Sequence, residues 1–364
     1  MSRNGDLLAD IRKLSQKQPA IFIGLDGFID RIIRVVDKRF DNSHCSYVPT
    51  LSEYGRRISD ASGLSLNVEI VSEKSQLGGN GPIMAQACAR LGAEVTCLGA
   101  FGVPDLVQEF EPLAKEATLL SVTEPARTDA WEFDDGKIIA SQLSPLNKLT
   151  WDTILAHVSE TELCHIFSQS DLIALNNWTM IPAMTEIWAE MRKRIFQFLT
   201  QRERILFFDL ADPSKRMKQD LLSALLSINE FAPFGKVLLS CNKREILQIA
   251  EVLECDTENG NLLRLAKSVC MRLGIWAVAI HTLTGSCMAG EEMEAEAEGF
   301  YTEKPLISVG GGDHFNAGLA WSLLRGFPWD KSLLMGSAVS GYYVRTGMSP
   351  TTRDIESFLE HGFI

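Results

Sequence analysis

The segment VGGGDHFNAG, residues 309–318, decides the fold class and the chemistry expected of this chain. Three glycines, Gly310, Gly311 and Gly312, precede the acidic residue Asp313, and an apolar helical pattern follows. Glycines let a backbone turn tightly and bring consecutive N–H groups close to a ligand, and a helix start adds the positive end of its dipole. The segment is therefore expected to form an anion hole suited to a transferring phosphoryl group. Asp313 at the helix start is equally explained as an N-cap, so the segment alone leaves both roles open.

Buried strands and amphipathic helices alternate along the rest of the chain. Helical patterns cover residues 82–91 and 182–199. Short apolar runs predict strands at 20–25, 94–99, 172–176, 205–210, 236–241 and 275–280. This alternation predicts an α/β fold, with a mostly parallel sheet covered by helices on both faces.

Two segments, residues 31–75 and 121–142, do not fit the alternation. The first is rich in turn formers and β-branched residues, with weak helical periodicity. The second contains Asp135-Gly136 between apolar residues, which predicts a hairpin turn. We expect both to form antiparallel pieces of a small second sheet, inserted between the early strands and able to act as a lid.

Composition excludes several classes of protein. The chain has 364 residues and is 46% hydrophobic and 23% charged, which is ordinary globular usage. Its 35 Lys+Arg and 47 Asp+Glu give a net charge of -12, which argues against non-specific nucleic-acid binding. A phosphate ligand is still possible, because backbone N–H groups hold anions without net positive charge.

The chain is expected to be cytoplasmic. No apolar run approaches the roughly 18 residues of a membrane span, and the polar first residues lack the apolar core of a signal peptide. The eight cysteines include no C-x-x-C pair, which predicts reduced thiols rather than disulfides or a zinc site. There is also no Walker A loop, no protein-kinase signature and no G-x-G-x-x-G, so a dinucleotide-dependent oxidoreductase has no fingerprint here.

Two polar segments near the first strand predict a ligand site. In QLGGNGP, residues 76–82, adjacent glycines permit close approach of a polyhydroxyl ligand, and Asn80 offers both donor and acceptor. The alternative is a plain loop before a helix. In GLDGFID, residues 24–30, Asp26 and Asp30 follow a strand, where open α/β sheets bind their ligands. A carboxylate there can accept two sugar hydroxyls, and Asp26 is equally placed to serve the adjacent turn.

A third segment, residues 240–245, follows another buried strand. Asn242 and Glu245, three residues apart, have the donor types that hold the water shell of Mg²⁺. The same pair is expected of a helix N-cap with a capping-box acid, so both readings stay open.

Taken together and in this order, the four segments resemble the PfkB (ribokinase-like) carbohydrate kinase family. The resemblance covers roughly residues 20–350. It implies a single kinase domain over residues 1–364, built as a three-layer α/β/α sandwich with a mostly parallel central sheet and a small β-sheet lid. The matching positions are Asp30, Gly78-Gly79 through Gly92, Asn242 with Glu245, and Gly310 to Asp313.

The resemblance implies phosphorylation, dependent on ATP and Mg²⁺, of a hydroxyl on a sugar or sugar-like molecule. Asp313 is then the general base, and the backbone of Gly310, Gly311 and Gly312 is the anion hole. Further site residues follow from the same comparison. The sugar is oriented by Asp30, Gly78, Gly79, Asn80 and Asn176; Mg²⁺ is organised through water by Asn242 and Glu245; the nucleotide is met by Asn242, Thr282, Gly285, Gly336 and Ser337.

Three positions depart from the family pattern. Ile83 stands where the family usually has Asn, and Thr282 replaces the first Gly of a Gly-x-x-Gly nucleotide loop. Ile307-Ser308 replaces an Asp-Thr pair that often serves a monovalent cation, so potassium activation of the usual kind is not expected. Ribose as the substrate is not implied.

Other functions remain open at this point. An ADP-dependent sugar kinase shares some similarity at residues 78–81 and at Glu132-Phe133, and a nucleoside kinase is a further possibility. A sugar- or nucleotide-binding protein that has lost turnover is a different class, against which the intact Asp313 and its glycines stand. The family also implies a homodimer through the lid, because an exposed small sheet needs cover.

Overall fold

The computed structural model describes residues 3–13, 17–200, 202–256, 260–307 and 309–362. Within them, a nine-stranded sheet has the order β14-β13-β12-β11-β10-β9-β1-β5-β6. Its strands are β1 (Ala20–Gly24), β5 (Glu94–Ala100), β6 (Thr118–Thr123), β9 (Leu172–Asn176), β10 (Ile205–Asp209), β11 (Lys236–Asn242), β12 (Ala277–His281), β13 (Gly285–Ala289) and β14 (Glu294–Glu298).

The sheet is parallel from β6 to β12, and only β13 and β14 are antiparallel to their neighbours. All six strands predicted from apolar runs are present, with ends shifted by two residues at most. The apolar runs are continuous because both faces of these strands are buried under helices. The mostly parallel sheet predicted from the sequence is therefore confirmed.

Helices cover both faces and make three layers. One apolar core lies between the sheet and the first layer, and a second core lies between the sheet and the opposite layer. The first layer contains α5 (Trp151–Leu155), α6 (Glu160–Gln169), α7 (Met184–Arg194), α8 (Lys218–Asn229), α9 (Lys243–Val252) and α10 (Leu262–Leu273). The second contains α1 (Arg3–Arg12), α3 (Asn80–Arg90), α4 (Glu111–Ala114), α11 (Gly311–Leu324), α12 (Trp329–Thr346) and α13 (Thr352–His361).

The helix predicted at residues 182–199 is shorter than expected. Regular α-helix ends at Arg194, and a 3₁₀ turn follows at Phe196–Phe198. The turn places the ring of Phe196 against Phe167 and Phe231, so tertiary aromatic packing overrides helical periodicity there. The other 3₁₀ turns lie at Gln108–Phe110, Ser144–Lys148, Trp178–Met180, Pro213–Lys215 and Ala232–Phe234.

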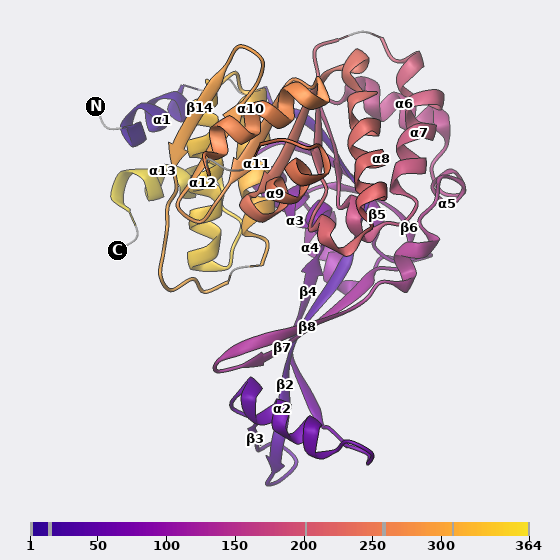
Figure 1. Cartoon of the computed structure of the whole chain (residues 1–364), viewed down its shortest axis with the longest axis vertical. Coiled ribbons are helices and arrows are strands. Elements are labelled where there is room, and N and C mark those ends of the chain that lie inside the picture. The colour runs from indigo at the N-terminus through magenta and orange to yellow at the C-terminus, as the bar shows by residue number, and fades with distance from the viewer. Residues whose placement is uncertain (1–2, 14–16, 201, 257–259, 308, 363–364) are drawn as a thin grey trace.

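A separate small sheet projects from the sandwich (Figure 1). We call it the lid sheet. The four-strand path β3-β2-β7-β8 is joined by β4, which also pairs with β2. The strands are β2 (Phe28–Arg39), β3 (Cys45–Tyr47), β4 (Ile70–Gly78), β7 (Ala126–Phe133) and β8 (Gly136–Gln142). The hairpin predicted at Asp135-Gly136 is present, with Phe133 opposite Gly136.

The lid sheet differs from the prediction in three respects. Residues 121–123 belong to β6 of the main sheet. The β2–β7 pair is parallel, whereas only antiparallel pieces were expected. The lid sheet also has a helix, α2 (Leu51–Asp60), which the sequence analysis missed. Thr50 caps α2, and Tyr54 is buried against Trp131 and Phe133, so the contacts of one aromatic side chain replace a long apolar face.

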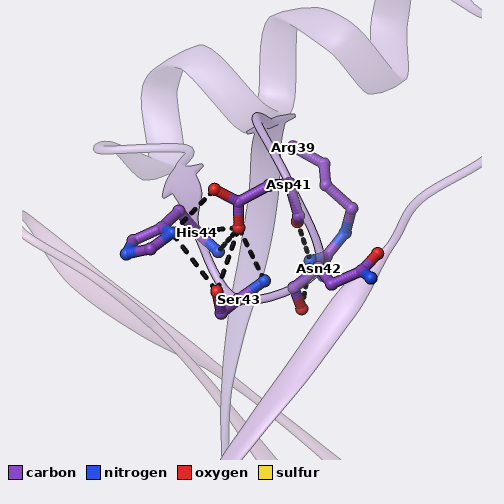
Figure 2. Close-up of polar contacts among 5 residues, drawn as sticks. All are labelled: Arg39, Asp41, Asn42, Ser43 and His44. Atoms are coloured by element: carbon purple, nitrogen blue, oxygen red, sulfur yellow. Dashed lines mark hydrogen bonds and ion pairs between the residues drawn. The ribbon is translucent and has the colours of Figure 1, made fainter.

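The turn between β2 and β3 is held by its own polar groups (Figure 2). The carboxylate of Asp41 accepts the N–H groups of Ser43 at 2.7 Å and His44 at 2.8 Å. These donors lower the pKa of Asp41 below its ordinary value. Arg39 donates to the carbonyl oxygens of Asp41 and Asn42 at 3.0 and 3.4 Å. These hydrogen bonds therefore stabilise the turn at the end of the lid sheet, which is a structural role.

All eight cysteines are free thiols, as expected. None of the helices formed by the described residues has the length and apolar character needed to cross a bilayer.

Candidate active site

The start of α11 has the geometry of an anion site. Gly310 takes φ +88°, a left-handed conformation that favours glycine, and the helix begins at Gly311. The first intrahelical bond runs from His314 N–H to the Gly310 carbonyl, at 3.1 Å. The N–H groups of Gly311, Gly312 and Asp313 therefore have no acceptor within the helix and are available to an anion.

Asp313 is not the N-cap of this helix, because Gly310 occupies that position and Asp313 lies in the first turn. The side chain is 7% exposed. Burial raises the pKa of Asp313 well above its ordinary value, the charges of Asp209 and Asp26 raise it further, and a hydrogen bond from Asn80 lowers it. Its Oδ1 is buried without a hydrogen-bond partner. A buried carboxylate oxygen without a donor is the arrangement that a ligand hydroxyl would complete.

The paired glycines make room for two carboxylates. A Cβ at Gly78 would lie 2.3 Å from Asp30 Oδ2, and one at Gly79 would lie 2.8 Å from Asp26 Oδ2. Gly79 also takes φ +97°, which disfavours any other residue. These glycines therefore have a structural role that the sequence analysis did not foresee. Contact with a sugar stays a prediction for both.

Asp26, whose role was left open, holds the start of α3. Its carboxylate accepts the N–H groups of Asn80 at 2.9 Å and Gly81 at 2.8 Å, and the amide of Asn177 at 2.6 Å. Burial raises the pKa of Asp26 to about 6, even though these three donors lower it. Asp30 differs from Asp26, because it lines a cavity. Burial, followed by the charge of Asp26, raises the pKa of Asp30 to about 6.

That cavity has a volume of about 580 Å³ and lies between the inner end of the lid sheet, α3 and the end of α12. It is large enough for a monosaccharide. Ile83, the departure from the family pattern, is in its wall with Asp30. Asn176 is fully buried next to α3, where its Nδ2 lies 3.2 Å from Met84 Sδ. Its Oδ1 has no partner, and its contact with a sugar stays a prediction.

His314 and Tyr343 are among the cavity residues that the sequence analysis did not predict. The ring of His314 stacks on Tyr343 with 3.6 Å between ring centroids. Nδ1 of His314 bonds the Gly310 carbonyl at 2.7 Å, and Nε2 bonds the Ser349 hydroxyl at 2.9 Å. Burial lowers the pKa of His314 to about 4, so the ring is neutral near pH 7. The one sequence signal was its position directly after Asp313.

Asn242 and Glu245 form the capping box of α9. Asn242 Oδ1 accepts the N–H groups of Arg244 at 2.8 Å and Glu245 at 3.0 Å, and Glu245 accepts the Asn242 N–H at 2.8 Å. Burial, followed by the charge of Asp209, raises the pKa of Glu245 to about 8. The capping alternative is therefore observed.

The same residues also suit a water-mediated magnesium site. Each Glu245 oxygen accepts one hydrogen bond from Asn242, which leaves capacity for a metal-bound water. Across the described part of the chain, no group of three or more His, Cys, Asp and Glu is arranged to hold a metal directly. Oxygen donors that act through water are what Mg²⁺ accepts most readily.

Four of the residues assigned to the nucleotide lie at the β12–β13 turn and on α12. Thr282 closes the β12–β13 turn, where its hydroxyl donates to the Gly285 carbonyl at 2.9 Å. A Cβ at Gly336 would lie 2.8 Å from the Phe315 carbonyl, so this glycine permits the close crossing of α11 and α12. The Ser337 hydroxyl lies 3.4 Å from Ser286 Oγ. Each of these residues has a packing or turn role. Nucleotide contact stays a prediction for them and for Asn242.

The buried carboxylates should make the ligand-free protein more stable as the pH falls from 8 to 6.5. The pKa is raised to about 6 for Asp26 and Asp30 and to about 8 for Glu245. The unfolded chain binds these protons only near pH 4, so in this range the folded state binds more protons and gains stability as pH falls. Burial lowers the pKa of His281 and His314 to about 4, and these two groups oppose the gain only at lower pH. Thermal unfolding should show a higher Tm at pH 6.5 than at pH 8. Glu245→Gln should flatten the slope, and a Tm that rises with pH in this range would contradict the assignment.

Comparisons with known proteins agree with this geometry. The sequence model of the family described as "Khk: Prokaryotic ketohexokinase" matches residues 10–362. A ketohexokinase of Haloferax volcanii is 27% identical over 343 residues, which cover 93% of this chain and 90% of the relative.

Solved structures share the fold. The ribokinase of Arabidopsis thaliana, complexed with ribose and ATP, aligns with a TM-score of 0.65 at 15% identity, covering 94% of this chain and 99% of that chain. The fructokinase of Xylella fastidiosa with bound ATP aligns with a TM-score of 0.62 at 14% identity, covering 95% and 99%. The predicted ribokinase-like fold is thereby confirmed. The chain belongs to the prokaryotic ketohexokinase family, within the ribokinase-like carbohydrate kinases, and is a carbohydrate kinase.

Proposed function

We propose that this carbohydrate kinase transfers the γ-phosphoryl group of ATP to a hydroxyl of a ketohexose. The observation that carries the proposal is the buried, unpartnered Oδ1 of Asp313, next to the free N–H groups at the start of α11. A base and an anion hole on one helical turn are the two protein functions that phosphoryl transfer to an alcohol requires. The family match and the ketohexokinase of Haloferax volcanii favour a ketohexose as the acceptor.

Asp313 acts as the general base. Its Oδ1 takes the proton of the acceptor hydroxyl as that oxygen forms a bond to the γ-phosphorus of ATP, and the bond from this phosphorus to the β–γ bridging oxygen breaks to release ADP. The N–H groups of Gly311 and Gly312, together with the turn at Gly310, stabilise the charge on the transferred group. The raised pKa of Asp313 makes it a stronger base than an exposed carboxylate.

The remaining residues position the two substrates. Mg²⁺ neutralises phosphate charge when it is bound, and Asn242 and Glu245 hold its water shell. Thr282, Gly285, Gly336 and Ser337 meet the nucleotide. Asp30 accepts sugar hydroxyls, with Gly78, Gly79, Asn80 and Asn176 around it. Because Asp30 lies on β2, the strand that extends into the lid sheet, movement of this sheet is tied to sugar binding.

We also propose a homodimer formed through the lid sheet. The edge strand β8 is exposed along its whole length, including Ile138 and Ile139. An exposed apolar edge is a pairing surface that a second copy would cover. Light scattering should report a dimer, and a monomer at assay concentration would remove the proposal.

The direct test is ADP release from ATP and Mg²⁺ with a panel of ketohexoses, aldohexoses, pentoses and nucleosides. Release should depend on the acceptor and be fastest with a ketohexose. If ADP release is fastest with a nucleoside, the acceptor is a nucleoside and the proposed ketohexose is wrong. Turnover with ADP as the donor, and none with ATP, would make the enzyme ADP-dependent. Binding of ATP without turnover on any acceptor would favour a protein that has lost catalysis.

A further inference from the structure

A chain of buried hydrogen bonds runs from α11 to the strand ends beneath it. Asn316 lies one turn after Asp313, and its Nδ2 donates to Asp209 Oδ2 at 2.7 Å. The hydroxyl of Ser240 donates to Asn316 Oδ1 at 2.6 Å. Asn316, Asp209 and Ser240 are all buried. Since both ends of its amide are bonded, Asn316 has one orientation: the reverse would place its oxygen against the carboxylate of Asp209.

The hydrogen bonds continue from Asp209 to the start of α3. The Asp209 carbonyl accepts the N–H of Asn177 at 2.7 Å, and Asn177 Nδ2 donates to Asp26 Oδ2 at 2.6 Å. Asp26 accepts the N–H of Asn80 at 2.9 Å, and Asn80 is also one of the groups that lower the pKa of Asp313. The path therefore leaves α11 one turn beyond the base and ends at Asn80, at the start of α3. We call it the buried ring: Asp26, Asn80, Asn177, Asp209, Asp313 and Asn316.

We propose that Asn316 and Asn177 are positioning residues for phosphoryl transfer. Through the buried ring they hold the first turns of α11, and with them Asp313, at a fixed place relative to α3. This inference rests on the proposed function, in which Asp313 is the base. Neither asparagine touches the reacting atoms in that mechanism. Each fixes the position of a group that does, or of a group that bonds to one.

Stability alone does not account for this arrangement. A buried polar network is often no more stabilising than a well-packed apolar replacement. What the network supplies is a single orientation of Asn316, because both ends of its amide are bonded. A displacement of about 1 Å at a reacting group can cost about 10²-fold in rate. A network that fixes the position of the base is therefore expected to raise kcat of the enzyme rather than the stability of the protein.

The sharpest variant is Asn177→Gly, because Asn177 takes φ +61°, which glycine adopts freely. The substitution removes the donor to Asp26 without a change in charge and keeps the backbone N–H that bonds Asp209. Ala211→Gly is the matched control, since Ala211 takes φ +58° in the next strand-end loop and its side chain makes no hydrogen bond. We expect kcat of Asn177→Gly to fall about tenfold or more, with KM values close to wild type, and Ala211→Gly to keep the wild-type kcat.

A charge swap tests the other half of the ring. Asn316→Asp places a second carboxylate against that of Asp209 and should lower kcat. Combining it with Asp209→Asn restores a donor opposite an acceptor, and the local charge of this double variant equals that of wild type. The double variant should recover most of the kcat that Asn316→Asp loses. A purely structural effect would instead move Tm and leave kcat of the folded fraction unchanged.

The outcomes separate this inference from the proposed function. Wild-type kcat in folded Asn177→Gly, or no recovery in the charge swap, overturns the positioning role. If Asn177→Gly does not fold, the charge swap decides alone, and if neither variant folds, the ring is a stability element and the inference is overturned. An active Asp313→Asn enzyme would instead overturn the base itself.

Discussion

Asp313→Asn is expected to lower kcat by about 10³-fold, because the amide cannot take the proton of the acceptor hydroxyl. The substitution keeps the shape of the side chain, so KM for ATP and for the sugar should change little. Loss of kcat without loss of binding is the signature of a group needed only in the transition state. Steady-state kinetics with each substrate varied in turn would measure both quantities.

A matched control for this variant is Asp330→Asn. Asp330 also lies in the first turn of a helix, α12, but is exposed and lies outside the cavity. It should behave as wild type. Equal kcat for Asp313→Asn and wild type would remove Asp313 from the chemistry, even with every contact described here intact.

The second large effect is expected on the sugar side. Asp30→Ala should lower kcat/KM for the sugar by about a hundredfold or more and leave the KM for ATP nearly unchanged. A hydrogen bond to a charged acceptor contributes about 1.5–3 kcal/mol, and the carboxylate of Asp30 is expected to accept two hydroxyls. Initial rates at varied sugar and saturating ATP would provide the measurement.

Glu73→Gln is the control for this substitution. Glu73 is an exposed acid on β4, the strand that pairs with β2 opposite Asp30, and it does not line the cavity. A loss of ATP affinity in Asp30→Ala, with the sugar affinity unchanged, would show that the cavity beside Asp30 is not the sugar site.

The sequence was sufficient for the sandwich but not for all of the lid sheet. Continuous apolar runs such as residues 205–210 mark buried parallel strands, since both faces of such strands are covered. The helix α2 gave no such signal, because one residue, Tyr54, provides its buried contact. The parallel pairing of β2 with β7 joins segments about 100 residues apart, and no local pattern records it.

The same contrast between local patterns and contacts of distant residues applies to the candidate site. The glycine turn before Asp313 and the Asn242–Glu245 pair were found because their members are neighbours in the sequence. The contacts of Asn316 with Asp209, and of Asn177 with Asp26, span 107 and 151 residues. The structural need for Gly78 was not foreseen, because the carboxylate of Asp30 that lies against it belongs to another strand.

The most direct test of the account is to follow the fate of the phosphoryl group with ³¹P NMR in a mixture of enzyme, ATP, Mg²⁺ and D-fructose. The account predicts one fructose phosphate for each ADP formed, no free phosphate, and neither product with Asp313→Asn. Free phosphate in place of the sugar phosphate, or sugar phosphate formed equally fast by Asp313→Asn, would contradict transfer to a sugar hydroxyl by this base.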